Sequence, residues 1–246
     1  MELYYAPGAC SLATHIVSRE AGLAVNLVRV DMGTKKTEAG ADYFAINGKG
    51  YVPAIRFDDG EVMTEVATLV QVLADKNPGA GLAPALGTPE RYRLMEWLTF
   101  IGSEIHKGFA PLWYPTTPEA TKTAIKQRLA MRFAWLEQQL AGRDYLMGAR
   151  ISVADAYAFA ILNWAGMLNV DVAPYPNIRA FLARIASRPK VGGIEGGGPS
   201  PRQGGIAAPS PLDPRAIACH PSGLTRGSRS PRLSAGSSDR AALARG

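Results

Sequence analysis

The first 76 residues alternate between strand-like and helix-like patterns of apolar side chains. Four short apolar runs predict strands: residues 2–5, 25–30, 53–57 and 61–64. The last two runs flank Asp58-Asp59-Gly60, a typical hairpin turn. Residues 11–21 and 65–75 carry the longer period of a helix. This order of elements predicts a compact domain of mixed strands and helices over residues 1–77.

From residue 88 onward the apolar pattern is helical throughout. Three stripes of apolar residues, spaced three or four positions apart, are Leu94, Trp97, Leu98, Ile101 and Ile105; Ile125, Leu129, Phe133, Leu136 and Leu140; and Ile178, Phe181, Leu182 and Ile185. A further helix is predicted to begin at Ser152, because Ser152 and Asp155 have the spacing of a capping box. We therefore expect an all-helical domain over residues 88–188.

The composition changes after residue 188. Residues 189–246 are rich in Gly, Pro, Arg and Ser and contain no aromatic side chain. Such a segment cannot bury enough apolar surface to offset its chain entropy, so we expect a disordered tail. Our hypothesis is that a reading-frame change near Val191 produced this sequence.

Charge and composition narrow the range of partners. The 246-residue chain has a formal net charge of +6, but most of the excess lies in the tail, so we expect no nucleic-acid partner. No apolar run reaches the roughly 18 residues of a membrane span, and no basic leader precedes one, so we expect no membrane partner. Two distant cysteines make no disulfide framework, which favours the cytoplasm, and three histidines without ligand spacing predict no metal site.

Cys10 is the first candidate for chemistry, because it stands where a helix is predicted to begin. The first four N–H groups of a helix have no partner inside the helix and carry partial positive charge, which stabilises a thiolate. Cysteines in such positions have pKa values lowered from ~8.5 to about 3.5–7.5. The alternative is a small buried residue that fills the turn.

Three further positions match the groups of an extended peptide. Pro53 is either an ordinary proline at the start of a strand or the site of a cis bond, which would leave the N–H and C=O of Val52 unpaired and facing outward. Glu65, at a predicted helix start, is either a capping carboxylate or an acceptor for a ligand ammonium. Lys35 is either a solvated surface residue or the partner of a ligand carboxylate. Together with the Cys10 thiol, these groups match the thiol, backbone, ammonium and carboxylates of glutathione.

Several segments of the chain share the motifs of one enzyme family: residues 3–12 (LYYAPGACSL), 35–38 (KKTE), 49–54 (KGYVPA), 63–65 (MTE), 103–107 (SEIHK) and 152–157 (SVADAY). These segments resemble the bacterial beta-class glutathione S-transferases, over residues 1 to about 190. The resemblance implies an α+β fold with a thioredoxin-like N-terminal domain plus an all-helical C-terminal domain. It also implies a homodimer, with glutathione as co-substrate and no other cofactor.

The resemblance implies roles for individual residues. Cys10 would lie against the glutathione sulfur, where it can form a mixed disulfide, and His106 would be the second catalytic residue. The implied glutathione-binding residues are Lys35, Val52, Pro53, Glu65, Val66, Ser103, Glu104 and Lys107. Glu104 would reach the ligand of the neighbouring subunit. Tyr114 and Trp164 would line the pocket for a small hydrophobic electrophile.

The spacing of three polar residues is consistent with a binding or catalytic site on the helical domain. Thr99, Ser103 and His106 are spaced i, i+4 and i+7, so they share one helix face. A histidine and a lysine beside a sulfur favour its anionic form, which is the nucleophile.

Three functions remain open on this evidence. The leading one is a glutathione transferase that activates the thiol for conjugation to hydrophobic electrophiles. The second is glutathione-dependent thiol–disulfide exchange through Cys10; glutathione itself would then resolve the mixed disulfide, because no second cysteine follows in residues 11–13. The third is non-catalytic binding of glutathione or apolar ligands.

Overall fold

A five-stranded sheet forms the N-terminal part of the protein in the structure, a computed structural model that describes residues 1–194. The strands are β1 (Glu2–Tyr5), β2 (Asn26–Asp31), β3 (Lys36–Thr37), β4 (Ala54–Arg56) and β5 (Val62–Thr64). Their order is β3-β2-β1-β4-β5; β1 and β2 are parallel, whereas the pairs β1–β4, β2–β3 and β4–β5 are antiparallel. All four predicted strands are present, and the short β3 adds an edge that the sequence pattern did not reveal.

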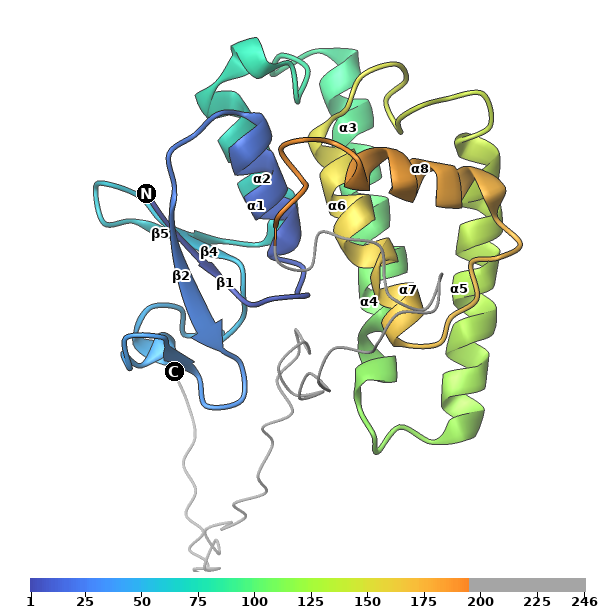
Figure 1. The fold of residues 1–246 in the computed structure, drawn as a ribbon, viewed down its shortest axis with the longest axis horizontal. Helices are drawn as coiled ribbons and strands as arrows, with labels where there is room; N and C mark the ends of the chain where they lie inside the picture. The colour runs from blue at the N-terminus through green and yellow to red at the C-terminus, as the bar shows by residue number, and fades with distance from the viewer. Residues whose placement is uncertain (195–246) are drawn as a thin grey trace, which may run out of the picture.

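Two helices cover the face of the sheet that looks toward the second domain. They are α1 (Leu12–Glu20) and α2 (Val66–Lys76), and both also pack against α6 of the helical domain (Figure 1). Their buried side chains belong to one apolar core that extends from Leu3 to Ile194. A smaller apolar cluster, which includes Tyr4, Met32 and Tyr43, lies apart from this main core. The short 3₁₀ helix η1 (Tyr43–Ala45) supplies its Tyr43.

The second part of the chain is helical, as predicted. Its elements are η2 (Pro78–Ala80), α3 (Pro89–Phe100), η3 (Ile101–His106), α4 (Lys107–Phe109), η4 (Ala110–Trp113), α5 (Glu119–Gln139), α6 (Val153–Leu162), α7 (Trp164–Met167) and α8 (Pro176–Ala186). Every residue of α6 is buried, because this helix lies between α1, α2 and the other helices (Figure 1). Within residues 1–194, no helix has both the length and the apolar character needed to cross a membrane.

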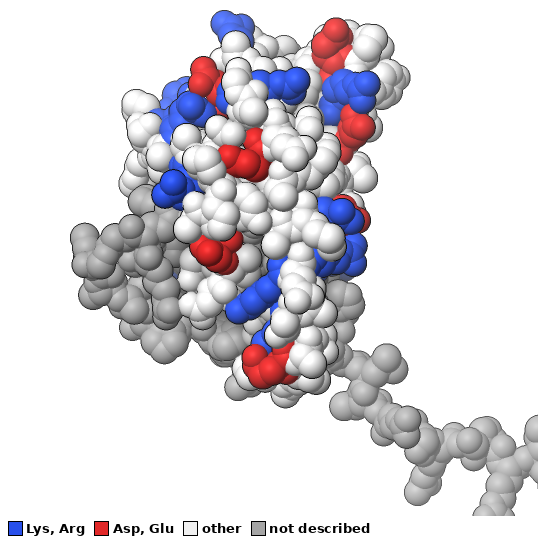
Figure 2. Space-filling view, turned by 90° about the vertical axis from the view of Figure 1, so that its right-hand side faces the viewer, with Lys and Arg blue, Asp and Glu red and all other residues white. Residues whose placement is uncertain are grey.

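These elements confirm the predicted thioredoxin-like domain followed by a helical domain. The exact limits 1–77 and 88–188 stay predictions. The predicted disordered tail and the reading-frame hypothesis concern residues that, apart from 189–194, lie outside the described part of the chain. On the face of the molecule in Figure 2, basic and acidic side chains are intermixed, so they do not build a field of one sign there.

The helix expected over residues 94–105 changes its winding after Phe100. Residues Ile101–His106 (η3) are a π-helical segment, and the N–H of Lys107 bonds the carbonyl of Gly102, five residues earlier. Such wider turns occur often at functional sites. The apolar spacing of the sequence continues through this segment, which is why the pattern alone predicted an ordinary helix.

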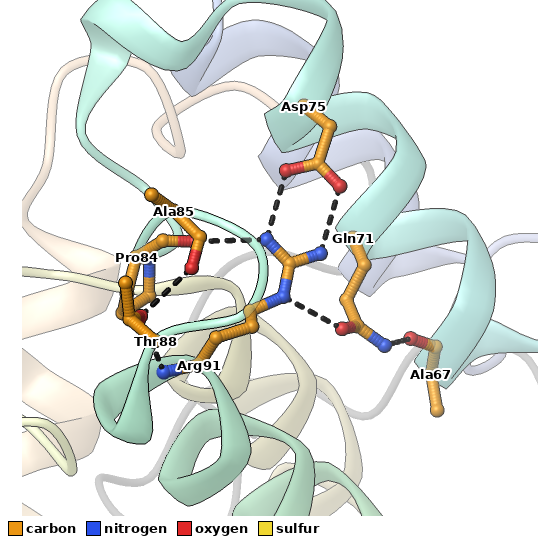
Figure 3. Close-up of polar contacts among 7 residues, drawn as sticks. All are labelled: Ala67, Gln71, Asp75, Pro84, Ala85, Thr88 and Arg91. Atoms are coloured by element: carbon orange, nitrogen blue, oxygen red, sulfur yellow. Dashed lines mark hydrogen bonds and ion pairs between the residues drawn. The ribbon is translucent and has the colours of Figure 1, made fainter.

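A buried arginine joins α2 to α3 (Figure 3). Arg91 is 2% exposed and donates to both carboxylate oxygens of Asp75, at 2.8 and 2.7 Å. Its other donors bond the side-chain oxygen of Gln71 and the carbonyl of Pro84. Gln71 in turn donates to the carbonyl of Ala67, in the first turn of α2. A paired, fully hydrogen-bonded guanidinium has a defined geometry, so this network fixes α2 relative to α3.

The predicted capping box is present at the start of α6. The Asp155 carboxylate accepts from the N–H and hydroxyl of Ser152 and from the N–H of Leu146, each at 2.7 Å. Burial raises the pKa of this carboxyl from 3.8 to about 6, although the three donors act in the opposite direction. Asp155 therefore ties the loop before α6 to the most deeply buried helix of the fold.

We predict that Asp155→Ala lowers the free energy of unfolding by about 2–6 kcal/mol, because two buried N–H groups each lose their acceptor at about 1–3 kcal/mol. Denaturant unfolding measures the change. The control is Asp144→Ala, which removes an exposed ion pair with Arg184 and is expected to cost about 0–1 kcal/mol. Equal losses in both variants would contradict the role of the buried carboxylate.

The same carboxyl makes stability depend on pH. The folded chain holds the Asp155 proton to a higher pH than the unfolded chain does, since its pKa is raised to about 6. Its stabilising contribution is therefore complete below about pH 4 and is lost as the pH rises through the folded pKa. Wild type is expected to lose stability relative to Asp155→Asn over this interval.

Candidate functional site

A cleft of about 440 Å³ lies between the two domains. This volume is within the range of about 300–1,000 Å³ that is usual for small-molecule sites. One wall comes from the thioredoxin-like domain: Cys10, Asn47, Lys49, Tyr51, Val52, Pro53, Thr64, Glu65, Val66 and Ala67. The other comes from the helical domain: Leu98, Thr99, Gly102, Ser103, His106, Lys107 and Tyr157. The cleft therefore exists only while the two domains are packed together.

Cys10 lines the cleft but is 1% exposed. Its thiol donates a hydrogen bond to the carbonyl of Val52, at 3.3 Å. The helix begins two residues later, at Leu12, and the N–H groups of Leu12 and Ala13 bond the carbonyls of Ala9 and Cys10. The structure corrects the sequence prediction here: two of the N–H groups expected to be open at the helix start already have backbone acceptors.

The peptide bond between Val52 and Pro53 is cis, as predicted. The segment lines the cleft directly before β4 and faces Cys10. The prediction that both backbone groups of Val52 are unpaired is wrong for the carbonyl, because the Cys10 thiol donates to it. A ligand that uses this carbonyl must share it with the thiol.

Glu65 stands at the junction of β5 and α2 in an unusual conformation. Its φ of 72° is in the left-handed region, which a non-glycine residue rarely adopts and which often marks a functional position. Its carboxylate pairs with Lys49, at 2.6 Å, and the same ammonium donates to the Thr64 hydroxyl. Both charged side chains are at least half exposed, so ligand groups can reach them. Val66, the next residue, is nearly buried and lines the cleft.

A different lysine from the one that the sequence suggested lines the cleft. Lys35 donates to the carbonyl of Gly50, at 2.9 Å, and is not among the residues that line the cleft. Lys49 does line it, beside Glu65. Sequence reasoning missed Lys49, although it lies within the KGYVPA segment, because the pattern does not show which lysine the loop turns inward.

The helical wall brings together the residues expected to share a helix face. Thr99, Ser103, His106 and Lys107 all line the cleft. The Ser103 hydroxyl donates to the carbonyl of Thr99, at 2.8 Å. The Nδ1 atom of His106 lies 2.7 Å from the Tyr157 hydroxyl. Sequence reasoning did not identify Tyr157 as a site residue, because it belongs to a different helix, α6.

Three other predicted site residues lie away from the cleft. The Glu104 carboxylate bonds Arg132 and Arg128 of α5, at 2.7 and 3.1 Å, and these guanidinium groups hold its pKa below the usual range. Its predicted contact with a neighbouring subunit's ligand stays a prediction. Trp164 is 1% exposed, and its indole donates to the carbonyl of Gly8.

Trp164 is not among the residues that line this cleft, and its ring packs edge-on against His106 with centroids 5.0 Å apart, so its place in an electrophile pocket stays a prediction. Tyr114 is half-buried at the end of η4, and it is likewise absent from the cleft walls. The described part of the chain contains no cluster of three His, Cys, Asp or Glu side chains that could hold a metal ion.

Two family models match the chain. The model described as "Glutathione S-transferase, N-terminal domain" matches residues 8–76, and "Glutathione S-transferase, C-terminal domain" matches residues 94–189. The sequence is 42% identical over 191 residues to glutathione S-transferase GstA of Escherichia coli O157:H7. This alignment covers 78% of the chain and 95% of that protein.

Solved structures of the same kind superpose on the described fold. A sphingomonad glutathione S-transferase complexed with glutathione has a TM-score of 0.75 and 45% identity, over 77% of this chain and 94% of that one. A bacterial beta-class glutathione S-transferase of Sphingomonas chungbukensis has a TM-score of 0.75 and 43% identity, over the same shares of both chains.

The burial of Cys10 predicts slow chemical modification. Iodoacetamide is expected to alkylate Cys10 of the folded chain at least about tenfold more slowly than N-acetylcysteine at pH 7.5, because the sulfur is covered and its proton is donated to Val52. Mass spectrometry of the Cys10 peptide measures the rate. In denaturant the two rates should converge. Alkylation of the folded chain faster than that of the small thiol would contradict the structure and favour an exposed thiolate.

Proposed function

Because the chain belongs to the glutathione S-transferase family, we propose that it binds glutathione between its two domains and joins it, through its sulfur, to a small hydrophobic electrophile. The main support is the cleft itself, which sets groups suited to a peptide on one wall opposite groups suited to an anionic sulfur on the other. Removal of toxic electrophiles as the biological role, and a cytoplasmic location, stay predictions.

The thioredoxin-like wall offers contacts for the two ends and the backbone of glutathione. The peptide extends along Val52 and Pro53, and its γ-glutamyl ammonium meets the Glu65 carboxylate. Its α-carboxylate lies at the start of α2, near Val66, where the helix carries partial positive charge. The glycyl carboxylate is within the reach of a lysine, and Lys49 suits this role better than Lys35, because only Lys49 lines the cleft.

The helical wall offers the groups that act on the sulfur. His106 and Lys107 both line the cleft, and a hydrogen-bond donor or a positive charge beside a thiol favours loss of its proton. The resulting thiolate attacks an electrophilic carbon, so that an S–C bond forms and a leaving group such as chloride departs with its electron pair. The apolar electrophile lies against Leu98 and the rings of Tyr51 and Tyr157, in place of the predicted Tyr114 and Trp164.

The direct test is conjugation of glutathione to 1-chloro-2,4-dinitrobenzene, followed by absorbance. We predict turnover above the protein-free rate, and we predict that Cys10→Ala retains conjugation within about fivefold while it loses glutathione-dependent disulfide exchange. Cys219→Ala serves as the control for removal of a thiol. Turnover no faster than without protein, together with calorimetric binding of glutathione, would favour the non-catalytic alternative. Loss of conjugation in Cys10→Ala would make Cys10 the conjugating group.

We also propose that the protein forms a homodimer through the outer faces of α3 and α5. Four large apolar side chains are 42–62% exposed there: Tyr92, Met95, Met131 and Trp135. The Trp135 ring packs on Trp97 and Phe100, so residues of both helices form one patch. Contiguous exposed apolar surface of this kind commonly marks an association site, and a second copy of the patch would cover it symmetrically.

We predict that Met131→Glu shifts the protein from dimer to monomer in sedimentation velocity. A charge on this surface would be buried without a partner in the proposed dimer, which raises the dissociation constant at least about 100-fold. Leu86→Glu is the matched control, because Leu86 is 73% exposed in the loop before α3 and lies outside the patch. A wild-type monomer at all concentrations, or an unchanged dimer in Met131→Glu, would overturn the proposed interface.

A further inference from the structure

One histidine in the cleft wall has one nitrogen paired and the other not. His106 is 8% exposed, and its Nδ1 atom lies 2.7 Å from the Tyr157 hydroxyl oxygen. Its Nε2 atom is buried and has no hydrogen-bond partner among residues 1–194, while the residue lines the cleft. A buried polar atom without a partner in a cleft wall is suited to a ligand atom, because leaving it unpaired costs about 1–3 kcal/mol.

The hydrogen bond to Tyr157 decides which nitrogen carries the proton. Neutral imidazole has one N–H, and the nitrogen without it is an acceptor. A phenol hydroxyl is a good donor, so its contact with Nδ1 makes Nδ1 the acceptor and leaves the proton on Nε2. We propose that Tyr157 is a positioning residue that holds His106 in the Nε2–H form, so that Nε2–H donates to the anionic sulfur of the bound co-substrate.

The surroundings hold this pair in one arrangement. Tyr157 is 4% exposed on α6, the helix that is buried on all sides. Gly102, in the π-helical segment, lies beside its hydroxyl, since a Cβ there would be in ordinary van der Waals contact with the oxygen at 3.4 Å. The His106 ring also packs edge-on against Trp164, which is itself bonded to Gly8. The imidazole is thus fixed by a hydrogen bond on one side and by a ring contact on another.

This assignment deepens the proposed function, since the identity of the acceptor rests on glutathione binding, but the tautomer itself does not. Loss of the phenol hydroxyl would leave Nδ1 buried without a donor and let the proton move to it. Nε2 would then present a lone pair, which repels a thiolate. The effect falls on kcat, because the contacts proposed for the carboxylates and ammonium of glutathione lie on the other wall.

The first measurement is the tautomer of His106 in the full chain without glutathione. Nitrogen-15 NMR at pH 8.5, with the His106 signals identified by their loss in His106→Phe, distinguishes Nδ1–H from Nε2–H. We expect the Nε2–H form in wild type and a shift toward Nδ1–H in Tyr157→Phe. A wild-type protein in the Nδ1–H form would overturn the proposal, whether or not the variant folds.

The second measurement is a double-mutant cycle on conjugation. Tyr157→Phe is expected to lower kcat about 10–50-fold with the KM for glutathione within about twofold, and to change kcat by less than about twofold when His106 is already Phe. Tyr175→Phe, which removes a hydroxyl bonded to Ala130 away from the cleft, is the control.

Additive losses in the cycle, or an unchanged kcat in Tyr157→Phe, would overturn the proposal. A wild type that shows the Nε2–H signal but no conjugation would instead refute the proposed function and the assigned acceptor, and leave the pairing of Tyr157 with His106 in place.

Discussion

The packing of the two domains against each other is the constraint on which the rest of the structure depends. Neither domain forms the candidate site alone, because ten of its lining residues come from the thioredoxin-like domain and seven from the helical domain. Apolar burial of α1 and α2 against α6 contributes attraction between the domains, but burial is not directional. Hydrogen bonds between the two domains fix their relative orientation. Arg91 sets α2 against α3, and the Trp164 indole bonds the carbonyl of Gly8.

The second of these links lies beside the chemistry. Gly8 belongs to the turn that carries Cys10, and the Trp164 ring contacts His106. One buried side chain therefore supports both the thiol loop and the imidazole, which are on opposite walls. Trp164 is 1% exposed and is not among the cleft-lining residues, so its contribution here is to support both elements.

The features that the sequence predicted correctly are those that local patterns of residues determine. The strands, the helices and the capping box of Asp155 depend on residues close together in the chain, and the motifs carried the family resemblance. The π-helical turn at Ile101–His106 was missed because it keeps the apolar spacing of an α-helix. The choice of Lys49 over Lys35 for the cleft wall, and the pairing of Tyr157 with His106, depend on how distant segments meet, which spacing alone does not show.

The Cys10 thiol and the His106 imidazole lie on opposite walls of the cleft, and their surroundings differ. The Cys10 sulfur is covered, and its proton is already donated to Val52, so reaction at this atom requires the contact to open first. His106 lines the other wall, and its Nε2 atom, although buried, has no hydrogen-bond partner in the described chain. We therefore expect disulfide exchange through Cys10 to require that its contact with Val52 is broken, whereas donation from His106 requires only that a ligand atom reaches Nε2.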